Sequence, residues 1–176
     1  YRPWYSSRFA NIEEVADYWM KNYNTLKEKT ELFTDAFYAT TLPAEVVEAV
    51  AANLTILKSP TIFRQYDGRM WEGCGNEYGS CYGSCTHVWN YAQAIPHLFP
   101  KMERTLRETE FFVSQAKNGH QAFRSALPIR PIRHNFHAAA DGQLGGIMKV
   151  YRDWHIYGND EWLKLIYSYV QNSLDY

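Results

Sequence analysis

This 176-residue chain contains three cysteines, whose type and spacing could bind a metal. Cys74, Cys81 and Cys85 lie in one glycine-rich stretch, and His87 or His97 could complete a tetrahedral zinc site. Their C-x6-C-x3-C spacing lacks the paired C-x2-C knuckles that make a zinc motif specific. A disulfide between two of the three is another alternative, although an odd number argues against a complete disulfide framework. Structural thiols, without metal or cofactor, are therefore the favoured interpretation.

A carboxylate precedes this stretch, because Glu72 stands between Trp71 and Gly73. A glutamate that leaves the end of a strand can point into a cavity, and catalytic groups concentrate on loops held by a rigid scaffold. Trp71 would exclude water on one side, and the nearby glycines would let the backbone approach a ligand. A solvated surface glutamate is the alternative, and spacing alone favours it.

Two histidines and one aspartate form a third set of candidates. His134 and His137 have the H-x-x-H spacing, which can bind a metal when it lies on a helix. Their segment lacks a helical pattern, so surface or hydrogen-bonded histidines are the favoured interpretation. Asp141 stands at a predicted helix start, where the helix dipole favours an acid, and capping explains it without any further role.

The elements expected to position these residues are mostly helices. Asn11 and Glu14 resemble a capping box before a long amphipathic run. Asp67-Gly68 between two short apolar runs is a strong hairpin signal. Gly158 ends a later helical pattern, and Asp160 is the expected N-cap of the last one. The predicted elements are helices over about residues 12–37, 43–57, 86–94, 99–116, 141–157 and 160–174, a β-hairpin over about 61–73, and loop with short strands over about 117–137.

The helix over residues 99–116 carries opposite charges at helical spacing. Glu103 with Arg107, and Arg104 with Glu108, are i,i+4 pairs that we expect on its outer, solvent-exposed side. The whole pattern predicts an all-α protein, because the hairpin and the short strands are small beside the helices.

Composition limits the class of partner. The chain is 46% hydrophobic and 16% aromatic, which indicates carbohydrate only weakly, because helical cores are also rich in aromatic residues. The net charge is −1 without a basic patch, so nucleic acids and membrane surfaces are not expected partners. No apolar run approaches the roughly 18–20 residues of a membrane span. The thiols fit a cytoplasmic protein, and we expect this chain to be part of a longer polypeptide.

Four stretches carry a resemblance to a known family. They are "TELFTDAFYATTLP" at 30–43, "WEG" at 71–73, "CTHVWNYAQAIPHLFPKMERTLRETEF" at 85–111 and "AADGQLGGIMKVYRDWHIYGNDEWLK" at 139–164. They resemble the catalytic region of glycoside hydrolase family 116, and most closely its bacterial branch. The family includes the non-lysosomal glucosylceramidase and archaeal and bacterial β-glucosidases and β-xylosidases.

The resemblance implies a fold and an activity. Residues 1–176 would form the first, N-terminal half of an (α/α)6 barrel, or toroid. The family's N-terminal β-sandwich and the remaining barrel helices would lie outside these residues. The family hydrolyses β-glycosides with retention, and its glutamate nucleophile falls on Glu72. The aspartate that acts as acid/base would lie beyond Tyr176, so we expect this chain to be inactive alone and to act with the rest of its parent polypeptide.

The resemblance also assigns substrate-binding residues. Characterised members have an Asn-Thr-Tyr-Asp stretch after the nucleophile, whose aspartate contacts the sugar. Here the corresponding stretch ends in His87, which would take that role and change the sugar specificity. His134 or His137 would match a sugar-binding histidine, and Trp71 and Asp141 complete the expected site. A non-catalytic carbohydrate-binding or scaffold domain is the alternative function, and a zinc-stabilised interaction module is a third.

Overall fold

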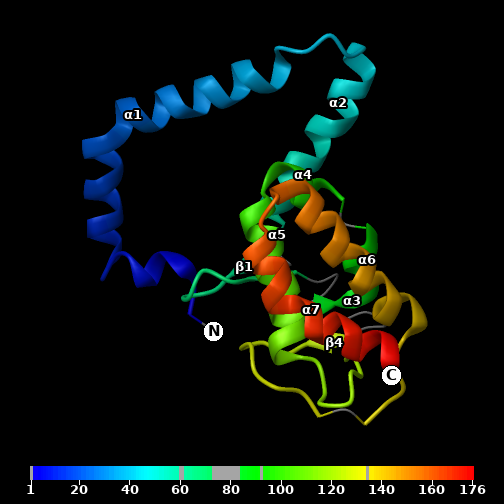
Figure 1. Ribbon diagram of the computed structural model, residues 1–176. Helices are drawn as coiled ribbons and strands as arrows, with labels where there is room; N and C mark the ends of the chain where they lie inside the picture. Colours follow the sequence, from blue (N-terminus) through cyan, green and yellow to red (C-terminus); the bar gives the residue numbers. More distant parts are fainter. Residues whose placement is uncertain (1, 60–61, 73–83, 92, 134) are drawn as a thin grey trace.

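The computed structural model describes residues 2–59, 62–72, 84–91, 93–133 and 135–176. Figure 1 shows a body of short helices and a long N-terminal arm that reaches away from it. The protein is mainly helical, as the sequence predicts, and two small antiparallel sheets occur among the described residues. In this part of the chain, no helix combines the length and the apolar character needed to cross a lipid bilayer.

The arm is built around helix α1, Ile12–Tyr38, which follows the 3-10 helix η1, Trp4–Ser7. The predicted start of α1 is confirmed, because Asn11 Oδ1 accepts a hydrogen bond from the Glu14 N–H at 2.9 Å. No residue of α1 is buried, and most of its large apolar side chains are exposed. Helix α2, Ala44–Ala52, leads back to the body and continues as the 3-10 helix η2, Asn53–Lys58, where an α-helix was expected.

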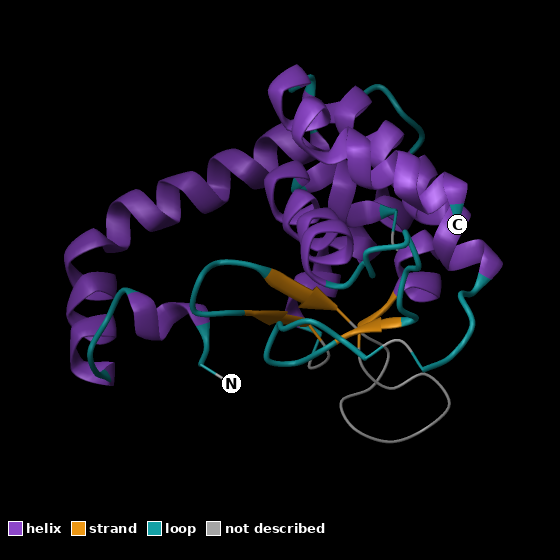
Figure 2. Cartoon of the chain, turned by 60° about the horizontal axis from the view of Figure 1, so that its bottom comes forward, coloured by secondary structure: helices purple, strands orange, loops and turns teal. Residues whose placement is uncertain are grey.

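The strands gather on one side of the helical body (Figure 2). The predicted hairpin is confirmed: β1, Ile62–Arg64, pairs antiparallel with β2, Met70–Glu72. Its turn places Gly68 at φ 90°, a conformation that glycine adopts at little cost. A second antiparallel pair joins β3, Ser84–Cys85, to β4, Arg124–Ser125. Strand β4 lies inside the segment that was predicted as loop and short strands.

The helical body is assembled around one central helix. Its elements are α3, Thr86–Tyr91, α4, Ala94–Leu98, α5, Pro100–Glu108, the π-helical turn η3, Thr109–Val113, α6, Ala140–Tyr157, and α7, Asp160–Asp175. The central helix is α6, which contacts α3, α5 and α7. The single helix expected over 99–116 is instead α5 followed by η3, and α3 forms the first part of the helix expected over 86–94.

The turn between α6 and α7 confirms one predicted signal and corrects another. Gly158 ends α6 in the left-handed region, at φ 67°. The N-cap of α7 is Asn159, whose side chain accepts from the Trp162 N–H at 2.9 Å, and not Asp160. Asp160 lies one residue inside the helix, where its Oδ1 accepts from Trp154 Nε1 at 2.8 Å. Asn and Asp are equally good caps, so the sequence alone did not decide between neighbours.

Two apolar clusters form the core, and charged residues lie between the same helices. One cluster contains Met70, Ile95 and Leu106, and the other contains Phe111, Val150, Trp162 and Ile166. The expectation that Glu103 and Arg107 lie on the outer side of their helix is wrong, because they are 1% and 0% exposed. They face α6, which presents charged partners of its own.

Gly119 supports a close contact between the loop after η3 and helix α7, and its replacement has a predictable cost. Its φ is 87°, and a Cβ there would lie 1.7 Å from the Asn172 carbonyl oxygen. Gly68 has a similar φ of 90° but nothing within 4 Å, which makes it a matched control. We expect Gly68→Ala to lower the free energy of unfolding by about 1–2 kcal/mol through φ alone. Gly119→Ala should cost roughly 1–3 kcal/mol more, because backbone must move.

Urea unfolding followed by circular dichroism measures both variants. Equal losses for Gly119→Ala and Gly68→Ala would contradict the packing argument, since the two positions differ only in the neighbouring backbone.

Candidate functional site

Glu72 is the last residue of β2, and this strand lies inside the protein. Met70, Trp71 and Glu72 are 1%, 2% and 3% exposed. The Met70 N–H donates to Thr105 Oγ1 at 2.9 Å. The Trp71 Nε1–H donates to the Ser125 carbonyl at 3.3 Å, so the two residues that precede the glutamate are fixed to other elements. This burial excludes the solvated surface glutamate that spacing alone favoured.

The environment of Glu72 makes its carboxyl group a weaker acid than an ordinary glutamate. Burial, and secondarily the carboxylate of Glu103, raise the pKa of Glu72 to about 7. The cationic side chains of Arg107 and Lys149 act in the opposite direction. Near neutral pH the group therefore exists both as acid and as carboxylate, with positive charges nearby that stabilise the anion. Carboxyl groups tuned in this way concentrate at functional sites.

A cluster of buried ionisable side chains from α5, η3 and α6 lies next to Glu72. Arg107 is at its centre, with Nη1 2.7 Å from Glu110 Oε2 and Nη2 3.7 Å from Glu103 Oε1. Its Nε lies 3.6 Å from Asp153 Oδ2. Arg152, at the more exposed side, places Nη2 2.6 Å from Glu103 Oε1. The buried ion cluster consists of Glu103, Arg107, Glu110, Lys149, Arg152 and Asp153.

Lys149 connects this cluster to the start of α3. Its Nζ donates to the Thr86 carbonyl at 3.3 Å and lies 3.7 Å from Glu110 Oε1. Burial, and secondarily the charge of Arg107, lower the pKa of Lys149 to about 8. An ammonium group that titrates this close to neutrality can stabilise a carboxylate or share a proton with it.

Local backbone features allow the helices of the site to approach one another. The π turn of η3 is closed by the Ser114 N–H to Thr109 carbonyl bond at 3.0 Å, and such turns are frequent at functional sites. On α6, a Cβ at Gly145 would lie 2.6 Å from Asn90 Oδ1, and one at Gly146 would lie 3.0 Å from Glu110 Oε1. Close helix packing therefore explains the Gly-Gly pair within α6.

His87 and Asp141 meet where the N-terminal ends of α3 and α6 come together. His87 Nδ1 pairs with Asp141 Oδ2, and both side chains are half exposed. The hydrogen bond to His87 is the main reason that the pKa of Asp141 is lowered. Asp141 Oδ1 also accepts from the Gly142 N–H at 2.9 Å. Asp141 lies in the first turn of α6, where the helix dipole favours an acid as expected, but it is not the cap, because the N-cap residue is Ala139. The Asn90 side-chain amide donates to the Asp141 carbonyl at 3.0 Å.

A concavity of about 560 Å³ opens between α3 and α6 beside this pair. Asn90, Gln93, Asp141, Lys149 and Arg152 supply its polar groups, and apolar side chains of α6 complete the lining. A ligand there would meet an ionised carboxylate, two cations and two amides. The mixture of polar groups and an apolar wall suits a small polar molecule such as a sugar.

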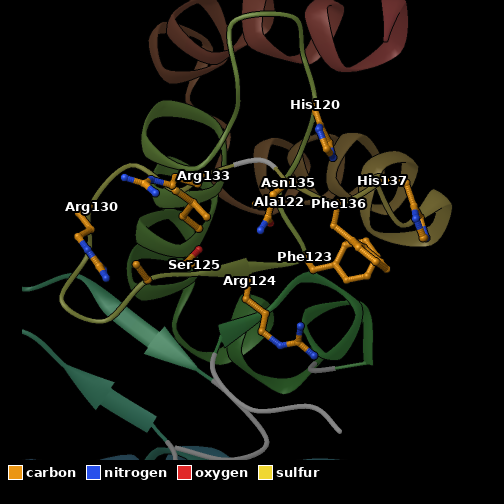
Figure 3. A pocket seen from close by; sticks show the side chains of 12 residues that line it. His120, Ala122, Phe123, Arg124, Ser125, Arg130, Arg133, Asn135, Phe136 and His137 are labelled. Carbon is orange, nitrogen blue, oxygen red and sulfur yellow. The ribbon is translucent and has the colours of Figure 1, made fainter. Parts of the chain in front are cut away.

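Other predicted residues lie elsewhere or serve differently. His137 is exposed, packs against Phe123 and Phe136, and lines a second concavity of about 640 Å³ (Figure 3). His134 lies outside the described residues. Trp71 packs against Phe63 with its ring buried, so we retain it as a support for Glu72.

The zinc and disulfide alternatives stay open, since Cys74 and Cys81 lie outside the described residues. Cys85 is 5% exposed in β3. Among the described residues no group of three or more histidine, cysteine or acidic side chains is arranged to hold a metal.

The buried ion cluster was missed at the level of sequence, and one signal could have indicated it. Glu103, Arg107 and Glu110 follow one another at helical spacing on the same side as the apolar residues Leu106 and Phe111. Charges that share a helix face with core residues point to buried partners on another element. Here these partners come from α6.

The raised pKa of Glu72 makes a prediction about stability. Folding disfavours its ionisation, so its carboxylate destabilises the fold as pH rises from about 4.5 through 7, by roughly 3 kcal/mol once ionisation is complete. We expect Glu72→Gln to raise the free energy of unfolding by about 1–3 kcal/mol at about pH 8, because a neutral amide avoids this cost. Near pH 4 the variant and the parent protein should be equally stable. Urea unfolding at both pH values tests this, with the exposed Glu28→Gln as control.

A destabilised Glu72→Gln variant at the higher pH would show that the ionised carboxylate is held by favourable contacts. That result would contradict the environment described above, in which burial outweighs the neighbouring cations.

The comparisons with known proteins give no independent assignment. No protein-family model and no curated protein matches the chain.

Proposed function

We propose that the protein forms part of a retaining glycoside hydrolase that acts on β-glycosides, with Glu72 as the nucleophile. The observation that carries the proposal is the environment of Glu72. It is buried at the end of a rigid hairpin strand, its pKa is about 7, and Arg107 and Lys149 lie close enough to stabilise its anion. The stretches that resemble glycoside hydrolase family 116 surround this position and support the same assignment.

The proposed reaction has two steps. In the first, a Glu72 carboxylate oxygen bonds to the anomeric carbon while the bond from that carbon to the leaving oxygen breaks, and a separate acid protonates the leaving oxygen. In the second, water attacks the anomeric carbon, loses a proton to the same group, and releases Glu72 as a carboxylate. Retaining chemistry requires the two carboxyl groups to be about 5–5.5 Å apart.

The acid is best sought outside the described residues. Asp141 is a poor general acid, because its hydrogen bond with His87 favours the ionised form. Glu103 is engaged by Arg107 and Arg152 within the buried ion cluster. Under this proposal the acid comes from the part of the parent polypeptide beyond Tyr176, and the helical body is one half of an (α/α)6 barrel in a cytoplasmic enzyme.

Substrate binding falls to the groups around the α3 and α6 ends. Asp141 would accept hydrogen bonds from sugar hydroxyls, and the His87 ring would donate or accept one beside it. His87 and Asp141 are each half exposed, so a ligand can reach both. β-Glucosides, glucosylceramide and β-xylosides are the substrate types that the resemblance suggests.

Mechanism-based labelling of the complete polypeptide tests the proposal. A fluorinated β-glycoside that forms a slowly hydrolysed glycosyl ester should leave a covalent adduct on Glu72, located by peptide mass spectrometry. The absence of an adduct on any carboxylate, together with reversible sugar binding, would instead support a non-catalytic carbohydrate-binding domain. That alternative is favoured by one observation: Glu103, the described carboxyl group whose charge acts on Glu72, is engaged by two arginines.

A further inference from the structure

A basic pocket occurs in a segment without acidic residues. Between Glu110 and Asp141 the chain contains four Lys or Arg residues and three His residues, but no Asp or Glu. The overall charge of −1 conceals this local excess. The segment folds around the concavity of about 640 Å³, whose described lining contains three arginines, two histidines and no carboxylate.

The arginines reach the pocket from a strand and from a loop (Figure 3). Arg124 belongs to β4, and Arg130 and Arg133 belong to the loop that follows it. Arg130 and Arg133 are exposed, and within the described part of the chain neither forms an ion pair. Exposed arginines that line a concavity without a carboxylate partner can bind an anion without first breaking an ion pair.

An aromatic wall lies across the pocket from Arg130 and Arg133 (Figure 3). The rings of Phe123 and Phe136 meet edge to face, with centroids 5.3 Å apart, and His137 packs against both. Figure 3 shows these three rings together on one side of the pocket. Aromatic rings present apolar surface on which the C–H face of a sugar can stack.

The pocket is anchored to the candidate site. Its first segment is held by Gln143 of α6, whose Oε1 accepts from the Gln121 N–H at 2.9 Å and whose Nε2 donates to the Gly119 carbonyl at 2.8 Å. The Phe123 carbonyl accepts from the Thr86 N–H at 2.9 Å, one residue before His87. The pocket and the His87–Asp141 pair are therefore joined through the same backbone.

We propose that this pocket binds the anionic group of an acidic carbohydrate, a uronic acid carboxylate or a sulfate ester, with Arg130 and Arg133 holding the anion and the aromatic wall holding the sugar. Arginine suits both anions because its planar guanidinium donates two parallel hydrogen bonds to either. The proposal names a substrate class for the proposed glycosidase. It rests on that function for cleavage only, since binding requires neither Glu72 nor an acid/base.

Isothermal titration calorimetry with glucose, glucuronic acid, glucose 6-sulfate and inorganic sulfate tests the proposal. We expect at least one of the acidic sugars to bind about tenfold more tightly than glucose, and the preference to shrink at high salt. Which acidic sugar binds better distinguishes the carboxylate from the sulfate ester. Equal affinity for glucose and both acidic sugars would overturn the proposal, and so would inorganic sulfate binding as tightly as the preferred acidic sugar.

Two double variants separate the effect of the two arginines from the effect of a change in net charge. Arg130→Gln with Arg133→Gln should remove the preference for the acidic sugar and leave the weak binding of glucose unchanged. Lys27→Gln with Lys164→Gln makes the same change in net charge at exposed sites on α1 and α7, and should keep the preference. Loss of the preference in both double variants, or in neither, contradicts the assigned site.

The two proposals fail separately. Acidic-sugar binding that survives in Glu72→Gln, without any labelling of Glu72 in the parent protein, would overturn the glycosidase and leave the pocket. Labelling of Glu72 by neutral glycosides, without any preference for acidic sugars, would overturn the pocket alone.

Discussion

We expect Glu72→Gln to lower kcat/KM for an aryl β-glycoside by a factor of roughly 10⁴ or more in the complete polypeptide, which is the effect of losing a nucleophile if the proposed function is correct. The amide has nearly the same shape as the carboxyl group, but it cannot form the glycosyl ester. Asp67→Asn is the matched control on the same hairpin. Its side chain accepts from the Arg69 N–H at the exposed turn, so activity should stay within about twofold.

A second variant at the same position separates a nucleophile from a general acid. In Glu72→Ala, added azide can attack the anomeric carbon from the vacated side, and the product should be the glycosyl azide of inverted, α configuration. If Glu72 were the acid/base, azide would instead intercept a glycosyl ester on another residue and give the β-azide. The configuration of the product, read by proton NMR, decides between the two roles.

The pH dependence of kcat/KM also distinguishes a nucleophile from a general acid. A nucleophile must be ionised, and Glu72 has a pKa of about 7, so activity of the free enzyme should rise as pH increases through about 7. A fall in activity through the same range would indicate that the protonated form of Glu72 is the active one.

The parts of the fold that the sequence predicts are those with local causes. The start of α1 follows from a cap that Asn11 and Glu14 form within four residues, and the end of α6 follows from glycine in the left-handed region. The hairpin depends on Asp67-Gly68 at its turn. Each signal acts between near neighbours, so no knowledge of the rest of the chain is needed.

The buried ion cluster shows why other parts could not be predicted. An i,i+4 pair such as Glu103–Arg107 has the same spacing whether it faces water or another helix. Its location depends on Lys149, Arg152 and Asp153, which lie more than 40 residues further along the chain. Periodicity identifies a helix but not the chemistry of the helix that packs against it.

The candidate site was predicted residue by residue but not as an arrangement. The resemblance named His87 and Asp141 separately, and the structure brings them into contact across 54 residues of sequence. The role of Lys149 beside Glu72 follows only from three-dimensional packing. The resemblance to a glycosidase family stays a prediction that the labelling experiment tests.

We expect Arg107→Met to lower the free energy of unfolding by about 3–5 kcal/mol, the usual cost of removing one partner from a buried ion pair. Methionine fills part of the space of the guanidinium but leaves the carboxylates of Glu103, Glu110 and Asp153 without their central cation. Lys27→Met is the matched control, because Lys27 and Glu31 form an exposed pair at the same i,i+4 spacing, and its loss should cost about 0–1 kcal/mol. Urea unfolding at neutral pH measures both.

We attribute the expected instability of Arg107→Met to the lost positive charge and not to lost packing. Two further measurements distinguish these two causes. Burial raises the pKa of Glu103 and of Asp153, and the charge of Arg107 opposes that rise. Without Arg107 these carboxyl groups should protonate at higher pH, so the deficit of Arg107→Met should shrink as pH falls. Adding Glu110→Gln to Arg107→Met should recover part of the lost stability. The carboxylate of Glu110, which lies nearest to the Arg107 guanidinium and loses this cation in the variant, is then replaced by a neutral amide. A deficit that is independent of pH and unchanged by Glu110→Gln would mean that Arg107 stabilises the protein through its bulk and not through its charge.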